Sequence, residues 1–356
     1  MRTTSQVYKV NDTFEWLELA YRNRWTDGLP VIPPVREKVE EMIDYIGLAP
    51  DHMVGIVPPK MGNATIEKLA IQCVMAGCRP EYFPVVLAAL QAMLEEPFNL
   101  NGVQCTAHDV APLIIVSGPI VKQLEFNYSF GQFGGGSRAN ATVGRAIRLI
   151  LWNIGGGYTG EPDRATNSHP GRYTYCIAEN PDANPWPPLH SDFGVPPDKS
   201  GVTVFAAEAP HFCQYGITCP PADNLYVIAD VMATLGNNNQ YGLGQIFVKI
   251  SSGLAPAFGR DGWTKRDVQQ FLFEHARTPL KKLRRSPFWE NASQETQWPK
   301  WIYLSNDDEQ MPVVRRPEDI ITTVGGGVGA PVVCPGWGHY GGYAVAKPIE
   351  MPQRKK

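Results

Sequence analysis

The segment GVQCTAHDVAP contains three residues whose side chains are able to act together in catalysis. Cys105, His108 and Asp109 directly precede the apolar run 111–121. A histidine three positions after a cysteine can deprotonate the thiol, and a carboxylate can orient the imidazole ring. The same cysteine and histidine can also bind one metal ion, although the sequence has no second ligand pair at the spacing of a zinc site. Helix capping or core packing is the alternative role.

A thiol, a carboxylate and an imidazole follow one another in YTYCIAENPDANPWPPLH. Cys176 ends a strand-like run, and Glu179 and His190 lie in the irregular segment after it. A carboxylate and an imidazole on one loop can serve as general acid and general base. The alternative is a hydrogen-bonded structural loop without a catalytic role.

His211 and two cysteines follow the next strand-like run, in APHFCQYGITC. Loops at the carboxyl ends of strands are the usual ligand-binding positions of α/β proteins. We therefore keep a divalent metal ion as a candidate cofactor. Its candidate ligands are Cys105, His108, His190 and His211.

A run of glycines stands directly before an amphipathic helix in GQFGGGSRANATVGRAIRLILW, residues 131–152. This is not a Walker A loop, because no Lys-Ser/Thr pair follows the last glycine, and it has no GxGxxG spacing. The first backbone N–H groups of a helix nevertheless lack an intrahelical partner and attract anions. Arg138 and Arg145 offer planar forks for a carboxylate or phosphate, and Asn140 or Thr142 is expected to cap the helix. The alternative is a glycine turn with two solvated arginines.

Composition and charge exclude several classes of protein. Hydrophobic residues make up 43% and charged residues 19% of the 356 residues, as in an ordinary globular protein. The net charge of −3 gives no reason to expect a nucleic-acid partner. No apolar run reaches the roughly 20 residues that span a bilayer, and the amino terminus has no signal-peptide pattern. Seven scattered cysteines indicate reduced thiols, so we expect a cytoplasmic protein.

Strand-like and helix-like segments alternate along the chain, which predicts an α/β fold with mixed or partly parallel sheets. The expected strands cover residues 54–59, 111–121, 202–210, 244–252 and 319–327. The expected helices cover residues 64–77, 81–94, 141–154, 224–235 and 264–276.

A proline-rich connection, residues 181–201, divides the chain into two parts that look alike in outline. We expect an N-terminal helical segment (1–50) packed on the core, a first α/β lobe (51–180) and a second α/β lobe (202–356). The two similar lobes suggest an internal duplication. The crevice between them is then the natural place for a site.

Five motifs together resemble a bacterial protein family associated with, and sometimes fused to, small UGSC or CGSC (seleno)proteins. They are WTDGLPVIPP (25–34), VMAGCRPEYFPVVLAA (74–89), HDVAPLIIVSGPI (108–120), RANAT (138–142) and YTYCIAEN (173–180). The likeness covers roughly residues 15 to 345. The resemblance implies that a site is lined by His108, Arg138, Asn140, Cys176 and Glu179.

The chain also departs from that family's pattern. It has no Cys-Gly-Ser-Cys motif, so a redox thiol of that kind has to come from a second polypeptide. Residues 252–254 read Ser-Gly-Leu where the family has Pro-Glu-His, and residues 329–330 read Gly-Ala where it has Lys-His. Both changes remove an imidazole from the end of a second-lobe strand, which fits one subunit of a hetero-oligomer.

The residues and the resemblance together predict an enzyme, or the large subunit of a hetero-oligomeric enzyme, of the lyase or oxidoreductase type. It would act on a small anionic molecule by thiol and acid–base chemistry, such as cleavage of a carbon–heteroatom bond with a partner thiol. The expected partner is a homologous chain or a CGSC-type thiol protein, with neither nucleic acid nor a membrane involved. Two alternatives stay open: a diverged non-catalytic or regulatory subunit, and a metal-dependent hydrolase or lyase.

Each candidate residue has an expected role. The expected catalytic residues are Cys105, His108, Cys176 and Glu179, and the expected substrate-binding residues are Arg138, Asn140, Arg145 and His190.

Overall fold

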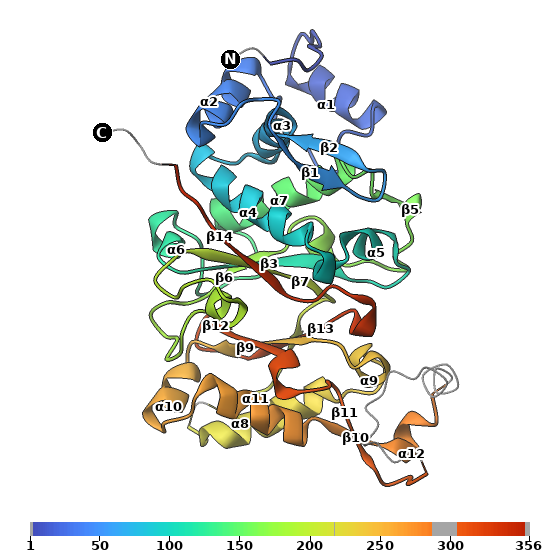
Figure 1. Cartoon of the computed structure of the whole chain (residues 1–356), viewed down its shortest axis with the longest axis vertical. Helices are drawn as coiled ribbons and strands as arrows, with labels where there is room; N and C mark the ends of the chain where they lie inside the picture. Colours follow the sequence, from blue (N-terminus) through green and yellow to red (C-terminus); the bar gives the residue numbers. More distant parts are fainter. Residues whose placement is uncertain (1–2, 217, 287–304, 353–356) are drawn as a thin grey trace.

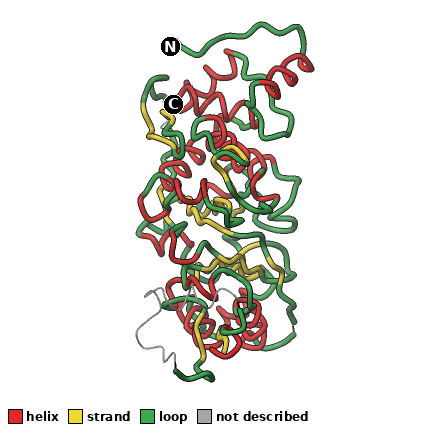
Figure 2. The backbone as a smooth tube through the Cα atoms, turned by 90° about the vertical axis from the view of Figure 1, so that its right-hand side faces the viewer, coloured by secondary structure: helices red, strands yellow, loops and turns green. Residues whose placement is uncertain are grey.

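Four layers stack along the long axis of the molecule (Figure 1). The computed structural model describes residues 3–216, 218–286 and 305–352. Helices form the two outer layers, and two sheets lie one above the other between them, as the view turned by 90° also shows (Figure 2). This arrangement buries both faces of each sheet, because helices cover one face and the other sheet covers the second.

The first sheet has four strands in the order β14-β7-β3-β6. Their bounds are β3 Ala111–Ser117, β6 Cys176–Ala178, β7 Gly201–Ala207 and β14 Val345–Pro348. Strands β3 and β6 are parallel, whereas β7 is antiparallel to both β3 and β14. The sheet is therefore mixed.

The second sheet has four strands in the order β12-β9-β13-β8. Their bounds are β8 His211–Phe212, β9 Ile246–Ser251, β12 Ile320–Gly325 and β13 Val332–Pro335. Strands β9 and β12 are parallel, whereas β13 is antiparallel to both β9 and β8. Read from β8 to β12, the strand directions follow the same order as from β14 to β6 in the first sheet. The predicted α/β class with mixed sheets is confirmed.

The chain passes from the first sheet to the second after β7 and returns to the first sheet with β14. Strand β8 follows β7 of the first sheet along the chain but pairs with β13 of the second. Strand β14 follows β13 of the second sheet but pairs with β7 of the first. The first sheet therefore takes β7 and β14 from the part of the chain after the proline-rich connection, and all four strands of the second sheet come from that part as well. The internal duplication stays a prediction.

An apolar layer fills the space between the sheets. In β9, Phe247 belongs to this layer, while its neighbours Ile246 and Val248 pack on the helices of the second lobe. Phe205 of β7 faces it from the first sheet, and the two ring centroids lie 6.4 Å apart. Successive side chains of a strand point to opposite faces of the sheet. One set therefore packs in the layer between the sheets, and the other packs against the helices.

Helices of the first half form the upper layer of Figure 1. They are α1 Thr13–Arg22, α2 Arg36–Ile46, α3 Ile66–Ala76, α4 Phe83–Met93, α5 Leu100–Cys105, α6 Ile120–Gln123 and α7 Arg138–Asn153. A hairpin of β1 Met53–Val57 and β2 Gly62–Thr65 lies beside them, as does the short pair β4 Tyr158–Thr159 and β5 Pro162–Asp163. Helices α2, α3, α4 and α7 share one apolar core with the first sheet.

Helices of the second half form the lower layer. They are α8 Pro221–Met232, α9 Asn239–Gly242, α10 Ala255–Arg260, α11 Lys265–His275 and α12 Leu280–Leu283, with the strand pair β10 Arg277–Pro279 and β11 Gln310–Pro312. Short 3-10 helices occur at η1 Pro80–Tyr82, η2 Glu96–Phe98, η3 Pro170–Arg172, η4 Leu189–Phe193, η5 Pro317–Asp319 and η6 Gly338–Tyr340. Within the described residues, none of the helices has the length and apolar character needed to cross a membrane.

Several element boundaries differ from the sequence expectation. The helix expected at 141–154 begins earlier, at Arg138, because Ser137 is its N-cap and accepts a hydrogen bond from the Asn140 N–H. The capping role expected for Asn140 or Thr142 was therefore wrong. The strand expected at 54–59 lies in the β1–β2 hairpin and joins neither main sheet.

The layer between the sheets predicts the response to a cavity mutation. Phe205→Ala removes a buried ring and is expected to lower the free energy of unfolding by about 3–5 kcal/mol. Phe14→Ala, at a side chain that is 79% exposed, serves as the control and should change it by about 0.5 kcal/mol or less. Urea unfolding of the two variants measures both values, and equal losses would contradict the layer's role.

Candidate functional site

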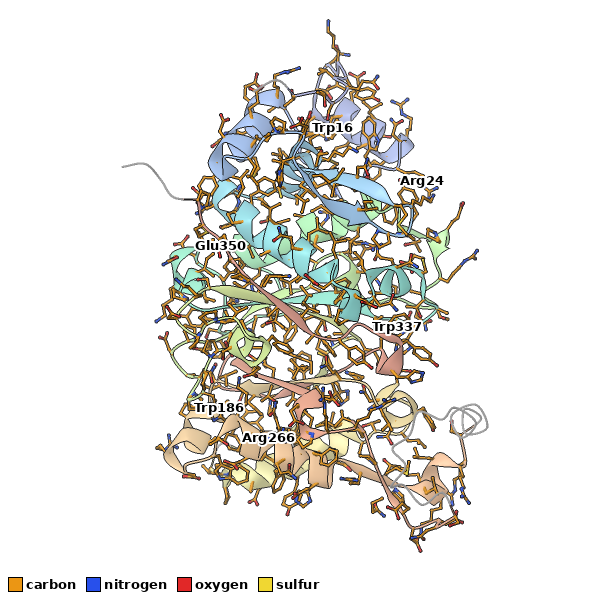
Figure 3. The ribbon with its side chains drawn as sticks, in the orientation of Figure 1. Trp16, Arg24, Trp186, Arg266, Trp337 and Glu350 are labelled. Carbon is orange, nitrogen blue, oxygen red and sulfur yellow. The ribbon has the colours of Figure 1, made fainter. Side chains whose placement is uncertain are left out.

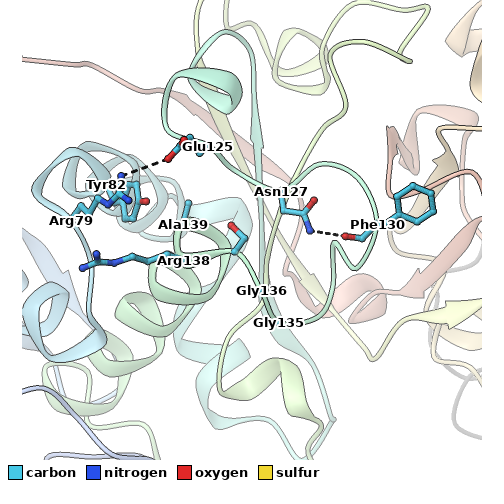
Figure 4. A pocket seen from close by; sticks show the side chains of 10 residues that line it. Arg79, Tyr82, Glu125, Asn127, Phe130, Gly135, Gly136, Arg138 and Ala139 are labelled. Carbon is cyan, nitrogen blue, oxygen red and sulfur yellow. Dashed lines mark hydrogen bonds and ion pairs between the residues drawn. The ribbon is translucent and has the colours of Figure 1, made fainter.

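A cavity of about 460 Å³ opens at the amino end of α7, and we call it the α7 pocket (Figure 4). Two of its walls are the glycine-rich loop and the first turn of α7; the third is the segment around η1. Its lining residues are Arg79, Tyr82, Glu125, Asn127, Phe130, Gly135, Gly136, Ser137, Arg138 and Ala139. The loop singled out in the sequence therefore forms part of a cavity rather than only a turn.

Backbone N–H groups are concentrated along one wall of the α7 pocket. The N–H of Gly134 donates to the Gly131 carbonyl, and the N–H of Asn140 donates to Ser137 Oγ at 3.3 Å. The five N–H groups between them, from Gly135 to Ala139, have no acceptor in the part of the chain that the structure describes. Gly136 has φ +106°, a conformation that other residues rarely adopt. The loop thus depends on glycine to present consecutive donors.

Two arginines face this pocket. Arg138 Nε donates to the Gly77 carbonyl at 3.0 Å, which fixes the side chain along the pocket edge, and no described residue accepts from its two Nη groups. Arg79 Nη1 lies 3.7 Å from Glu125 Oε2, and both side chains are exposed. One carboxylate therefore accompanies two guanidinium groups, and the pocket carries an excess of positive charge.

The other two residues expected to bind substrate beside Arg138 have structural partners. Arg145 holds Asp27 through two hydrogen bonds, Nε to Oδ2 at 3.0 Å and Nη2 to Oδ1 at 2.7 Å. The Asn140 side chain accepts from the Asn127 N–H at 2.8 Å and donates to the Asn127 carbonyl at 2.9 Å. Asn140 therefore ties the loop to α7, and Arg145 ties α7 to the segment after α1.

A second cavity lies under the glycine-rich loop and has a volume of about 20 Å³, room for about one water molecule. Asn140 and Cys176 both line it. The Cys176 side chain packs toward α7 within the core of the first lobe, and burial raises the pKa of its thiol well above the usual value. At neutral pH this sulfur is a protonated core thiol rather than a nucleophile.

Two of the residues Cys105, His108 and Asp109 have hydrogen-bond partners elsewhere in the fold. His108 Nε2 lies 2.8 Å from Glu208 Oε1, and His108 lines neither of the two cavities. Asp109 Oδ1 accepts from the backbone N–H groups of the loop at 167–168. Burial and the charge of Asp163 raise the pKa of the Cys105 thiol. Among the described residues, no hydrogen bond joins these three side chains, and His108 and Cys176 do not share a described cavity.

Glu179 and His190 lie at the carboxyl ends of β6 and β3. Glu179 accepts from Thr323 Oγ1 at 2.8 Å and from the Leu189 N–H at 2.9 Å, and burial raises its carboxyl pKa to about 7. His190 is fully buried, with Nδ1 2.6 Å from Ser117 Oγ. Burial also lowers the pKa of His190. Glu179 and His190, the predicted acid–base pair, therefore lie near each other in the fold, but both side chains are buried.

The candidate metal ligands are dispersed. His211 is exposed on the edge strand β8, whereas His190 is buried beside β3 and Cys105 ends α5. Among the described residues, no group of three or more histidine, cysteine or acidic side chains is arranged to hold a metal ion. All seven cysteines lie in the described part of the chain and are free thiols.

The sequence interpretation overlooked Lys249 in the middle of β9. Its side chain faces the layer between the sheets, is only 5% exposed, and has its Nζ 5.7 Å from the centre of the Phe133 ring. Burial lowers the pKa of this amine to about 8. The sequence feature that could have indicated this residue is a lysine two positions after Phe247, within the apolar run IFVKI of the strand GQIFVKISS. Arg79, which lies far from the loop in sequence, was also overlooked.

Comparison with known proteins yields no match. No protein-family model, no curated protein and no solved structure matches this chain.

The buried Glu179 carboxyl predicts a pH dependence of stability. The pKa of Glu179 is about 7 in the folded protein and about 4.3 in the unfolded chain, so the folded state binds the proton more tightly. The resulting contribution to stability is fully present below about pH 4.3 and is lost as the pH rises through about 7. Its loss amounts to on the order of 3 kcal/mol.

Glu179→Gln removes the titrating carboxyl and replaces it with an amide of similar shape. Urea unfolding at pH 5 and pH 8 should show that stability falls less with rising pH in Glu179→Gln than in the wild type. The same pH dependence in both proteins would show that Glu179 does not titrate in this window.

Proposed function

We propose that the chain binds a small anionic molecule in the α7 pocket and acts as an enzyme or as the large subunit of a hetero-oligomeric enzyme. The observation that carries the proposal is the run of five backbone N–H groups, Gly135 to Ala139, beside Arg79 and Arg138 in one cavity. A carboxylate or phosphate is the ligand chemistry that such donors favour.

Three physical effects act together on an anion in the pocket. The amino end of α7, a helix of 16 residues, carries the positive end of the helix dipole. Glycines at 135 and 136 allow a ligand to approach the backbone closely. The planar guanidinium of Arg138 adds charge-assisted hydrogen bonds. The Glu125 carboxylate opposes them, so the ligand's charge should lie nearer Arg138 than Arg79.

The proposed chemistry combines this site with a thiol from a second subunit. Cys176 is buried and protonated, so cleavage of a carbon–heteroatom bond by a thiolate calls for a sulfur supplied by a partner. A homologous chain or a CGSC-type thiol protein is the proposed partner, and a reducing cytoplasm is the proposed location, in keeping with seven free cysteines. Mass spectrometry of the natively purified protein tests the partner.

A regulatory subunit without catalysis is the second candidate. Ser252 is the first residue of the segment 252–254, which reads Pro-Glu-His in the family that the sequence resembles. Its Oγ donates to the Gly326 carbonyl at 2.6 Å and accepts from Asn180 Nδ2 at 2.8 Å. These bonds join the carboxyl ends of β6, β9 and β12. The position that the family's pattern gives to a histidine is Leu254 in this chain, and its side chain is buried in the core of the second lobe.

Arg138 variants test the anion site. Arg138→Ala should weaken the binding of phosphate or a small carboxylate about tenfold to a hundredfold, because hydrogen bonds to charged groups contribute about 1.5–3 kcal/mol. Arg138→Lys keeps the charge but loses the fork, so its affinity should lie between those of the wild type and the alanine variant. Isothermal titration calorimetry measures the affinities.

Arg266→Ala is the matched control. Arg266 lies on α11 in the lower layer (Figure 3), where it pairs with the exposed Glu318 at 2.7 Å, far along the chain from the pocket. This variant removes one positive charge from the protein without touching the pocket. The loop is only a turn if Arg138→Ala binds as tightly as Arg266→Ala.

A further inference from the structure

Arg172 presents an unusual buried guanidinium group. It ends the short helix η3, is 8% exposed, and donates from Nη1 to Asp163 Oδ2. Its Nε and Nη2 are also buried, and neither has a hydrogen-bond partner in the part of the chain that the structure describes. Unpaired buried donors are costly, since each has lost its hydrogen bonds to water.

The Nε and Nη2 groups form one edge of a guanidinium, and this edge binds carboxylates with two parallel hydrogen bonds. The same protein shows that arrangement at Arg145, where Nε and Nη2 reach the two oxygens of Asp27 at 3.0 Å and 2.7 Å. Arg172 has the same edge, more deeply buried than that of Arg145, without a described carboxylate on it. The ligand that completes it should therefore offer two oxygens on one centre.

Arg172 shares its carboxylate partner with a second buried arginine. A second buried arginine, Arg148, lies with Nη2 3.8 Å from the same Asp163 Oδ2. Burial lowers the pKa of both arginines, to about 10 for Arg148, and the charge of Arg172 contributes to that lowering. Asp109 is also near Arg172, but both its oxygens already accept hydrogen bonds from Asn167. Two buried cations therefore share one carboxylate directly.

We infer that Arg172 binds a small oxyanion, a carboxylate or a phosphate, through Nε and Nη2 at a second anion site between η3 and β5. The site lies just beneath the surface, since Tyr173, the next residue along the chain, is 45% exposed. It shares no lining residue with the α7 pocket and does not rest on the function proposed for that pocket. Asp163 fixes the arginine, and Arg148 adds positive charge.

Calorimetry in an Arg138→Ala background tests the inference, because that change weakens the α7 pocket. Sodium formate represents the carboxylate and sodium phosphate represents the phosphoryl group. One of the two should bind saturably, and Arg172→Lys added to this background should weaken its binding about tenfold or more, since lysine keeps a charge for Asp163 but has no two-donor edge. Binding of formate alone identifies a carboxylate ligand, and binding of phosphate alone identifies a phosphoryl ligand.

Arg145→Lys in the same background is the matched control. Its fork already binds Asp27, so this variant should lose stability and keep the affinity for the probe. A crystal structure of the Arg138→Ala protein with the bound probe gives a second measurement that does not depend on the folding of Arg172→Lys. The inference fails if neither probe binds saturably, if the lysine variants at 172 and 145 bind equally well, or if the crystal places the oxyanion away from Arg172 Nε and Nη2.

Discussion

The burial of two sheets against each other is the constraint on which the rest of the structure depends. Each sheet has helices on its outer face, so its inner face must be apolar or fully hydrogen-bonded. Phe205 and Phe247 meet that demand directly. Hydrogen bonds between the sheets form at the edge of the layer, where Glu179 accepts from Thr323 of the opposite sheet and Asn180 donates to Ser252. These bonds close the carboxyl ends of the parallel strands.

Because these bonds close the edge of the layer, the reactive side chains near the interface between the sheets are not accessible to solvent. His190 and Cys176 are sealed in the interior, and Lys249 has its amine between the sheets. The glycine-rich loop stays outside, because Asn140 holds it against α7 while the amides from Gly135 onward line an open cavity. Recognition of an anion at a helix terminus is therefore better supported than nucleophilic catalysis by one of the chain's own thiols.

The sequence predicted the α/β class and the position of the loop, because both follow from local patterns: alternating strands and helices, and glycines before an amphipathic helix. It did not predict the partners of individual side chains. Arg145 meets Asp27 across 118 positions of the chain, and His108 meets Glu208 across 100. Cys105 lies near His108 in the sequence, yet the tertiary partner of His108 is Glu208. The pairings of β8 with β13 and of β14 with β7 are equally non-local and have no sequence signal.

The most direct test of the account is a titration of the backbone amides in the glycine-rich loop. Two-dimensional ¹⁵N–¹H spectra of deuterated protein report each amide while phosphate or a small carboxylate is added. The account predicts saturable shifts for the residues from Gly135 to Ala139, with smaller changes for Gly131, which lies outside the pocket lining. Amides that do not respond, or that respond no more than the rest of the surface, would contradict it.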